Sequence, residues 1–276
     1  MKTEEYFQKA DTDVSAEPAG CQLTICMLAS GSRGNAIYIS DGSTAILFDA
    51  GLSGIEIQRR MASRGLNPVD LNAIVVSHEH NDHVSAVGVL ARRFKLPVYI
   101  NPRTLRAAGR LGALPTAIDF QCGTFFWIKT LKIRPFSTSH DAADPVGFTI
   151  ERNGRKIAIA TDLGIVTAMV REHLQGADIL IIEANHDPDM LLNGPYSWSL
   201  KQRIRSRLGH LSNHETRALL KSVAHSNLQH VILAHLSEAN NTPQKALGEV
   251  GLALDSPRVQ LSISSQDTCG DIITTG

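Results

Sequence analysis

Short apolar runs that stop abruptly at polar residues recur along this chain. Each run has the length of a β-strand and is bounded by polar residues or glycine, which is typical of strands buried on both faces. A side chain capable of acid–base or metal chemistry follows each run. The runs end at Asp49, His78, His140, Asp162, Glu183 and His235.

Helical patterns lie between these predicted strands, and several of them begin at recognisable capping residues. Pro102 occupies the first helical position after Asn101, and Ser212 forms a capping box with Glu215. The predicted helices cover residues 53–64, 102–111, 165–174, 213–225 and 243–253.

Two segments predict β-hairpins instead, at residues 35–48 and 146–160. The second contains Asn153-Gly154, the dipeptide that is typical of a two-residue hairpin turn. Hairpins followed by strand–helix alternation in each half of the chain indicate a mixed α/β (α+β) fold.

The chain shows no linker and no short-period repeat, so we expect one domain covering about residues 21–276. Residues 1–20 are polar and rich in acids, and they lack the apolar core of a signal peptide. They predict a flexible N-terminal extension.

Composition narrows the class of protein further. Of the 276 residues, 43% are hydrophobic and 20% are charged, with a formal net charge of +0, so polyanion binding would require a local basic patch or metal ions. The four cysteines, none of them in a C-x-x-C pair, are typical of a protein with buried thiols in a reducing compartment. No apolar run is long enough to cross a membrane. We therefore expect a cytoplasmic protein without a membrane partner.

The segment VVSHEHNDH contains His78, His80, Asp82 and His83 in the pattern H-x-H-x-D-H. A lone histidine is usually structural, but this many metal-binding side chains buried together without a metal would repel one another or lack partners. In an extended segment, His78 and His80 face the same way. Asp82 and His83 follow at a turn and can face a second point.

Residues at later strand ends supply the ligands still missing from two adjacent ions. One predicted site combines His78, His80, His140 and Asp162, and the other combines Asp82, His83, Asp162 and His235, so that Asp162 bridges both. Imidazole and carboxylate ligands without sulfur suit zinc, manganese or iron, and they do not suit calcium. The sequence therefore predicts two divalent metal ions.

This order of motifs resembles that of the metallo-β-lactamase-fold hydrolases, from Asp49 to His235. The resemblance implies a four-layer αββα sandwich with the metals at one edge. It also implies that Asp49 holds the second ring nitrogen of a metal-bound histidine, because such a histidine needs its other N–H held. Alternatively, Asp49 is only a turn residue before Gly51. The sulfur-ligated β-lactamases have Cys where this chain has Asp162, and the flavin-linked diiron members have Glu where His80 stands. These departures favour a dinuclear hydrolase.

Two ions about 3.5–4 Å apart can lower the pKa of a bridging water, so that hydroxide is the nucleophile. Asp82 can accept the proton that the bridging water loses. The ligands alone do not choose between a phosphodiester, a thioester, a lactone and an amide.

Flanking segments offer candidate substrate contacts. The Gly/Ser-rich turn at residues 28–39, which includes Ser32 and Asn35, can hold an oxyanion with its backbone N–H groups, or it can be an ordinary tight turn. His210, just before a helix start, is a candidate to protonate a leaving oxygen. A run of basic residues indicates phosphate contacts or a solvated helix. It consists of Lys201, Arg203, Arg205 and Arg207.

Six short motifs, ASGSRGN, DAGLS, SHEHNDH, EANHD, GHLSN and LAHLSEANN, resemble the YycJ/WalJ-like branch of this fold. That branch is linked with phosphodiesterase or 5′–3′ DNA exonuclease activity and is similar in outline to the RNase J and tRNase Z groups. Too few residues separate Asp162 from His235 to hold the large inserted domain of RNase J-type enzymes.

Three functions follow in order of preference. The first is a metal-dependent phosphodiesterase or nuclease with DNA as its partner. The second is a small-molecule thioesterase or lactonase, which the neutral net charge favours. The third is a non-catalytic regulatory metal protein, which is disfavoured because closed structural zinc sites need four ligands, whereas seven are present here. The sequence indicates no oligomeric state.

Overall fold

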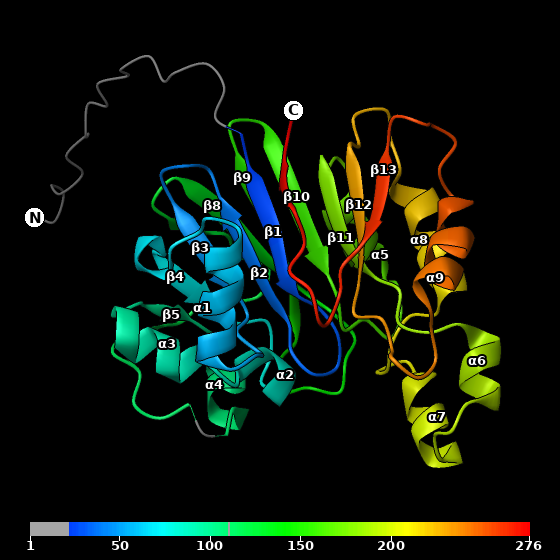
Figure 1. Ribbon diagram of the computed structural model, residues 1–276, viewed down its shortest axis with the longest axis horizontal. Coiled ribbons are helices and arrows are strands. Elements are labelled where there is room, and N and C mark those ends of the chain that lie inside the picture. Colours follow the sequence, from blue (N-terminus) through cyan, green and yellow to red (C-terminus); the bar gives the residue numbers. More distant parts are fainter. Residues whose placement is uncertain (1–21, 110) are drawn as a thin grey trace, which may run out of the picture.

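Two β-sheets packed face to face, with helices on both outer sides, form the part of the chain that the computed structural model describes, residues 22–109 and 111–276. Figure 1 shows α1 and α3 on one side of the strands and α8 and α9 on the other. The predicted four-layer αββα sandwich is therefore confirmed. The predicted N-terminal extension, residues 1–20, lies outside the described residues.

The first sheet has seven strands in the order β14-β1-β2-β3-β4-β5-β6. Its first four strands are antiparallel neighbours, and the strands from β3 to β6 run parallel. The strands are β1 (Thr24–Ala29), β2 (Ala36–Ser40), β3 (Ala45–Phe48), β4 (Ala73–Val75), β5 (Val98–Tyr99), β6 (Ala117–Ile118) and β14 (Ile272–Thr274).

The second sheet also has seven strands, in the order β13-β12-β11-β10-β9-β8-β7. Strands β7 to β10 are antiparallel neighbours, and β10 to β13 run parallel. The strands are β7 (Phe126–Ile128), β8 (Leu131–Ser137), β9 (Val146–Arg152), β10 (Arg155–Ala160), β11 (Ile179–Glu183), β12 (His230–Ala234) and β13 (Gln260–Ile263).

Both predicted hairpins are present, as β2–β3 and β9–β10. At the second turn, Asn153 and Gly154 both have positive φ, 48° and 79°. Two successive residues of this kind match the twist of the flanking strands, which is why Asn-Gly is favoured there.

Three hydrophobic clusters hold the layers together. On β10, Ile157 and Ile159 pack between the two sheets, whereas Ala158 and Ala160 pack against the helices behind the second sheet. The third cluster joins the first sheet to α1 and α3. Because successive side chains on a strand point to opposite faces, a strand buried on both faces reads as a continuous apolar run.

The predicted helices are present with adjusted ends. Thr167 caps α5, so this helix begins at Ala168 and not at residue 165, and α4 ends at Ala107. The capping box of Ser212 and Glu215 is formed. The confirmed helices are α1 (Gly54–Ser63), α4 (Pro102–Ala107), α5 (Ala168–Leu174), α8 (Asn213–Val223) and α9 (Pro243–Gly251).

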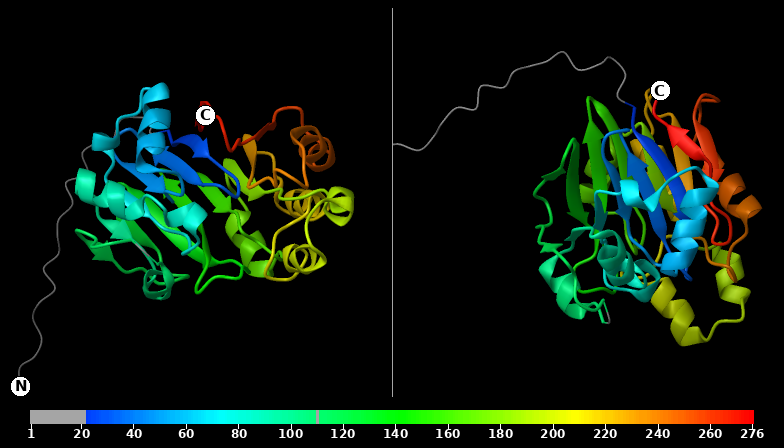
Figure 2. Two further views of the ribbon diagram at one scale, coloured as in Figure 1. Left: turned by 60° about the horizontal axis from the view of Figure 1, so that its bottom comes forward. Right: turned by 60° about the vertical axis from the view of Figure 1, so that its left-hand side comes forward.

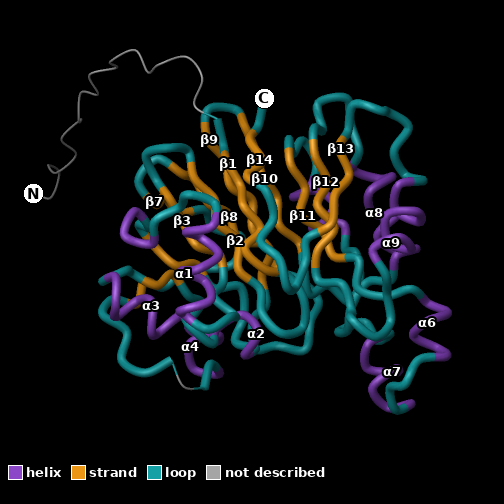
Figure 3. The backbone as a smooth tube through the Cα atoms, viewed as in Figure 1, coloured by secondary structure: helices purple, strands orange, loops and turns teal. Residues whose placement is uncertain are grey.

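Further helices were not among the predicted ones, although a helix was one alternative for the basic run that begins in α7. They are the 3-10 helix η1 (Pro68–Asp70), α2 (Asn81–Val84), α3 (Val87–Phe94), α6 (Pro188–Asn193) and α7 (Trp198–Ile204). We call residues 188–204 the α6–α7 arm, because these two helices extend beyond the end of the second sheet (Figures 1 and 2). Figure 3 shows them apart from the helices that cover the sheets. No helix in the described residues is long and apolar enough to cross a membrane.

Three of the predicted strand-end residues have left-handed backbone conformations. Asp49 and His235 follow β3 and β12 directly, and Asp162 lies two residues after the end of β10; their φ values are 58°, 55° and 55° for Asp49, Asp162 and His235. This conformation costs a non-glycine residue about 1 kcal/mol or more, and it persists only where the surrounding structure enforces it. The chain therefore turns sharply at three points along one edge of the sandwich.

Gly51 allows two segments of this edge to approach closely. A Cβ atom at this position would lie 1.6 Å from the carbonyl oxygen of Asp82. The backbone N–H of Asn35 donates to the same carbonyl at 2.7 Å. Any side chain larger than hydrogen would push the segment that carries Asp49 away from the histidine-rich segment.

We predict that Gly51→Ala lowers the free energy of unfolding by about 3 kcal/mol or more, because the overlap is with backbone that cannot move aside. Gly248→Ala is the matched control, since nothing lies within 4 Å of its added Cβ in α9. Alanine is the better helix former, so the control should be neutral or stabilising by up to about 1 kcal/mol. Denaturant titration measures both, and equal stabilities would contradict the close approach.

Candidate metal centre

The seven residues predicted as metal ligands converge at one edge of the sandwich. Each side chain contributes an atom to one or more compact groups whose potential ligand atoms lie within 4.8 Å of one another. They come from both sheets, because they follow β4, β8, β10 and β12. The residues are His78, His80, Asp82, His83, His140, Asp162 and His235.

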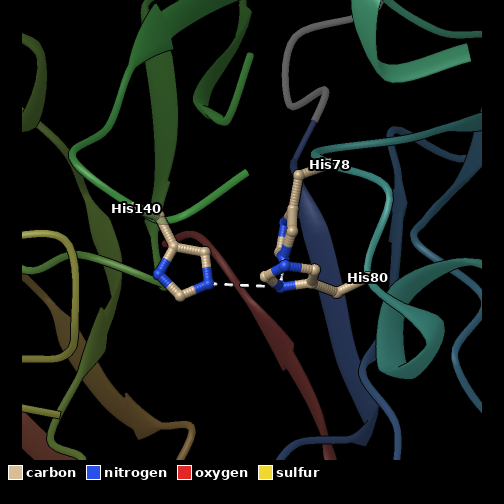
Figure 4. A group of neighbouring side chains, drawn as sticks. All are labelled: His78, His80 and His140. Atoms are coloured by element: carbon tan, nitrogen blue, oxygen red, sulfur yellow. Dashed lines mark hydrogen bonds between the residues drawn. The ribbon is translucent and has the colours of Figure 1, made fainter. Parts of the chain in front are cut away.

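Three histidines form the first group, and their rings point toward one another (Figure 4). Nδ1 of His80 lies 3.1 Å from Nε2 of His78 and 3.3 Å from Nε2 of His140. Oδ1 of Asp162 lies 3.8 Å from Nε2 of His140. These four residues are those predicted for the first ion.

The second group surrounds Asp82. Its Oδ2 lies 3.5 Å from Nε2 of His83 and 3.5 Å from Nε2 of His235. Asp162 spans both groups, since its Oδ2 lies 3.4 Å from Nε2 of His83 and its Oδ1 lies 3.5 Å from Nε2 of His235.

These separations suit metal coordination. Ligands at 2.0–2.1 Å from a tetrahedral zinc ion are about 3.3–3.4 Å apart, close to the spacings of both groups. Two of the ligand atoms, Oδ2 of Asp162 and Nε2 of His235, are also buried without a hydrogen-bond partner in the described part of the chain. Buried polar atoms are normally paired. The donor set therefore fits divalent metal ions.

The charges of the cluster depend on one another. Burial raises the pKa of the Asp162 carboxyl, but the imidazoles of His235 and His83 outweigh burial and hold this pKa well below its usual range. Burial lowers the pKa of His83, yet the carboxylates of Asp162 and Asp49 raise it well above its usual range. The central carboxylate is thus ionised, which is the form that binds a metal.

Hydrogen bonds fix the orientation of the histidine rings. Oδ2 of Asp49 lies 2.8 Å from Nδ1 of His83, and this carboxylate also accepts from the N–H and the hydroxyl of Ser77. Nδ1 of His140 lies 3.2 Å from the carbonyl oxygen of Gly209. Such contacts select the tautomer that leaves the other ring nitrogen free for a metal.

Glu183 is a further residue of the site, which the sequence identified as a strand-end residue but did not assign to the metal ligands or the catalytic groups. Its fully buried carboxylate lies 2.7 Å from Nδ1 of His210 and 3.3 Å from Nδ1 of His235. It also accepts from the backbone N–H groups of Leu163 and Leu211. Burial raises the pKa of Glu183, but His210 outweighs it and the pKa falls to about 2. Its position at the end of β11, level with the other strand-end residues, was the available signal.

His210 lies beside the metal-ligand candidates. Its ring stacks on that of His235 with centroids 5.1 Å apart, and the His140 ring lies at 5.0 Å. Burial lowers the pKa of His210, but the Glu183 carboxylate outweighs burial and raises it above its usual value. His210 therefore carries a proton more readily than an ordinary histidine does.

The Gly/Ser-rich turn contributes two different contacts. Asn35 is buried, and its Nδ2 lies 3.2 Å from Oδ2 of Asp82 and 3.0 Å from Nε2 of His83. Asn35 thus contacts the predicted ligands themselves. Ser32 lines a neighbouring pocket.

The basic run divides into residues with different surroundings. Lys201 is buried, and its ammonium group donates to the carbonyl oxygens of Leu192 and Gly194, both at 2.8 Å. Nε of Arg203 donates to Asp141 at 2.6 Å. The last two members, Arg205 and Arg207, are exposed.

A cavity of about 200 Å³ separates the metal-ligand candidates from the α6–α7 arm. His210 and His235 line one part of it, and Tyr196 and Arg203 line another. A substrate bound there would lie directly beside the cluster.

Comparison with known proteins identifies the family. Residues 44–236 match the model of the beta-lactamase superfamily domain. Exodeoxyribonuclease YycJ of Bacillus anthracis is 38% identical over 84% of this chain and 89% of the relative. Exodeoxyribonuclease WalJ of Streptococcus pneumoniae strain D39 is 37% identical over 80% of this chain and 84% of the relative.

Among solved structures, the fold is similar to that of the metallo-beta-lactamase fold protein YhfI from Bacillus subtilis. The TM-score is 0.72 at 18% identity, over 91% of this chain and 99% of YhfI. The sequence matches and the His/Asp cluster together support a metal-dependent hydrolase. The chain thus belongs to the metallo-β-lactamase superfamily and, within it, to the family of the YycJ and WalJ proteins.

Proposed function

We propose that this protein hydrolyses phosphodiester bonds of DNA as a 5′–3′ exonuclease that depends on two divalent metal ions. The observation that carries the proposal is the cluster of seven oxygen and nitrogen donors with Asp162 at its centre. The names of the two relatives, both exodeoxyribonucleases, support DNA as the substrate.

In this proposal His78, His80, His140 and Asp162 hold one ion. Asp82, His83, His235 and the same Asp162 hold the other. The absence of sulfur among these ligands favours zinc or manganese, with iron as a third candidate. Two such ions, when bound, supply an activated water and neutralise charge on the phosphate oxygens.

Asp82 is the carboxylate that we assign to proton transfer from the attacking water. Its side chain is 23% exposed, against 5% for that of Asp162, so it faces the side from which water arrives. Burial raises the pKa of Asp82, but His235 and His83 outweigh burial and lower it, which keeps the carboxylate ionised and able to accept a hydrogen bond from water.

His210 is the group that we assign to protonation of the leaving oxygen. Glu183 binds its Nδ1 at 2.7 Å, which directs Nε2 away from Glu183. The raised pKa of His210 favours the protonated form that a general acid requires. Its place in the pocket beside His235 brings it within reach of a substrate.

Phosphates farther along the strand are the expected partners of Arg205 and Arg207, which are exposed beyond α7. Because the net charge of the whole chain is +0, we expect a modest salt dependence that reflects only a few phosphate contacts. A small-molecule thioesterase or lactonase is the second candidate, and the restricted volume of the pocket, about 200 Å³, favours it.

The direct test is hydrolysis by metal-reconstituted protein. Purified protein with Zn²⁺ or Mn²⁺ is incubated with single- and double-stranded DNA and RNA that carry a 5′ or a 3′ label. A small phosphodiester and a thioester are tested in parallel. We expect the DNA to shorten from its 5′ end. Hydrolysis of the thioester alone would reject the nuclease and support the second candidate.

Asp162→Ala should reduce the bound metal from two ions to at most one per chain, because it removes the one carboxylate of the described residues that contacts both groups. Hydrolysis should fall by at least about 100-fold, because mutating a residue that only hydrogen-bonds to a metal ligand already lowers activity by up to about 100-fold. The matched control is Asp189→Asn, which changes an exposed carboxylate of α6 and should keep both ions. Elemental analysis measures the metal, and an unchanged content in Asp162→Ala would contradict the bridging role.

His210→Ala should lower the turnover number by about 100-fold or more while leaving the metal content unchanged, because a general acid contributes about 10²–10⁴-fold. His214→Ala is the control, since this histidine lies exposed on α8. If turnover on the best DNA substrate stays the same, His210 is not the proton donor.

Glu183→Gln should shift the alkaline limb of the rate profile to lower pH. The Glu183 carboxylate raises the pKa of His210, so its removal lets His210 lose its proton at a lower pH. The metal content must be measured alongside, since Oε1 of Glu183 also lies 3.3 Å from Nδ1 of His235. A limb that does not move in a fully metallated variant would exclude His210 as the acid.

A further inference from the structure

The cavity beside the metal-ligand candidates has two chemically different sides. Polar groups of His210, His235 and Asn185 line the side formed by the sandwich. Tyr196, Leu200 and Arg203 line the side formed by the α6–α7 arm. A ligand that fills the cavity therefore meets polar groups on the sandwich side, and both apolar surface and the guanidinium group of Arg203 on the arm side.

The apolar side is built by the arm itself. Leu200 and Ile204 are four residues apart on α7, so they lie on the same face of the helix and both line the cavity. Ile204 is buried, with 9% of its surface exposed. Tyr196 comes from the segment that joins α6 to α7 and lines the cavity as well.

Hydrogen bonds hold the segment that carries Tyr196. The Lys201 ammonium group donates to the carbonyl oxygens of Leu192 and Gly194, on the N-terminal side of Tyr196. Because two carbonyl groups share this buried cation, the segment cannot swing away without leaving a charge unpaired.

The other end of the arm packs tightly against the segment that carries His210. A Cβ atom at Gly209 would lie 2.1 Å from the carbonyl oxygen of Ile204, and the backbone N–H of His210 donates to that same oxygen at 2.9 Å. The C-terminal end of the arm is therefore fixed relative to His210, and the Lys201 contacts connect α7 to the end of α6 within the arm. The cavity is formed before any substrate arrives.

We propose that this cavity is a binding site for one unpaired nucleobase, adjacent to the phosphodiester that is cleaved, with Tyr196 as its stacking partner. The assignment rests on the proposed nuclease function. A nucleotide matches the two sides of the cavity, because its phosphate suits the metal-ligand side and its flat base suits the side of Tyr196, Leu200 and Ile204. Aromatic side chains bind bases of any sequence in this way.

The volume of the cavity suits a small occupant. Drug-sized ligands occupy pockets of about 300–1,000 Å³, whereas about 200 Å³ is available here. One base fits this space better than a base pair does. The terminal base of a duplex would therefore have to leave its partner before entry, as it does in enzymes that extrude a base from the stack.

A variant–substrate cycle tests the proposal. Metal-loaded wild-type protein and Tyr196→Ala act on two oligonucleotides, one with a normal nucleotide and one with an abasic unit at the end that is attacked. We expect Tyr196→Ala to lower kcat/KM about tenfold or more on the normal end, mainly through KM. On the abasic end, the variant and the wild type should be equal, because no base remains to stack.

Two further variants complete the design. Tyr196→Phe keeps the ring and should behave as wild type on both ends. Trp198→Ala removes an aromatic ring that lies on the same arm but is 58% exposed, and it should leave both rates unchanged. An equal loss on both ends by Tyr196→Ala would overturn the base site while leaving the nuclease in place. If wild-type protein cleaves no DNA at all, the proposed function itself fails.

Discussion

The site depends on one buried carboxylate, that of Asp162, held where imidazoles from both sheets meet. His83 approaches it from the first sheet and His235 from the second, so the packing of the two sheets sets the distances between these groups. The hydrophobic cluster between the sheets thereby fixes a polar geometry at their edge. The left-handed backbone of Asp162, which is costly by itself, persists because this packing enforces it.

Around that centre, the fold supports each ligand from behind. Asp49 and Glu183 are both at strand ends, and each binds the Nδ1 of a histidine whose Nε2 faces the cluster, His83 and His235 respectively. The two carboxylates are themselves held by backbone N–H groups. Because every link in these chains is short and buried, the ligand positions depend on the backbone and hardly on side-chain flexibility.

Much of this could be read from the sequence because it rests on local rules. Asn153-Gly154 closes a hairpin, and apolar runs that end at polar residues identify strands buried on both faces. The role of Glu183 could not be read in this way, since a carboxylate at a strand end is equally a helix cap. The same holds for Lys201. Its place in a basic run indicates a phosphate contact, but its ammonium group pairs with carbonyl groups that only the folded arm brings together.

Under the proposed function, the division between sandwich and arm also separates the residues for chemistry from those for substrate selection. The ligand set at the sheet edge is indifferent to what lies beyond the bond that is broken, since thioesters, lactones and phosphodiesters all present an oxygen or sulfur leaving group there. Among the described residues that line the cavity, those of the arm supply its apolar surface, through Tyr196, Leu200 and Ile204. A binding site built for the transition state must also recognise parts of the substrate that do not react. Under the proposed function, the α6–α7 arm is therefore the element of this chain that would distinguish one substrate class from another, while the sandwich would supply the chemistry.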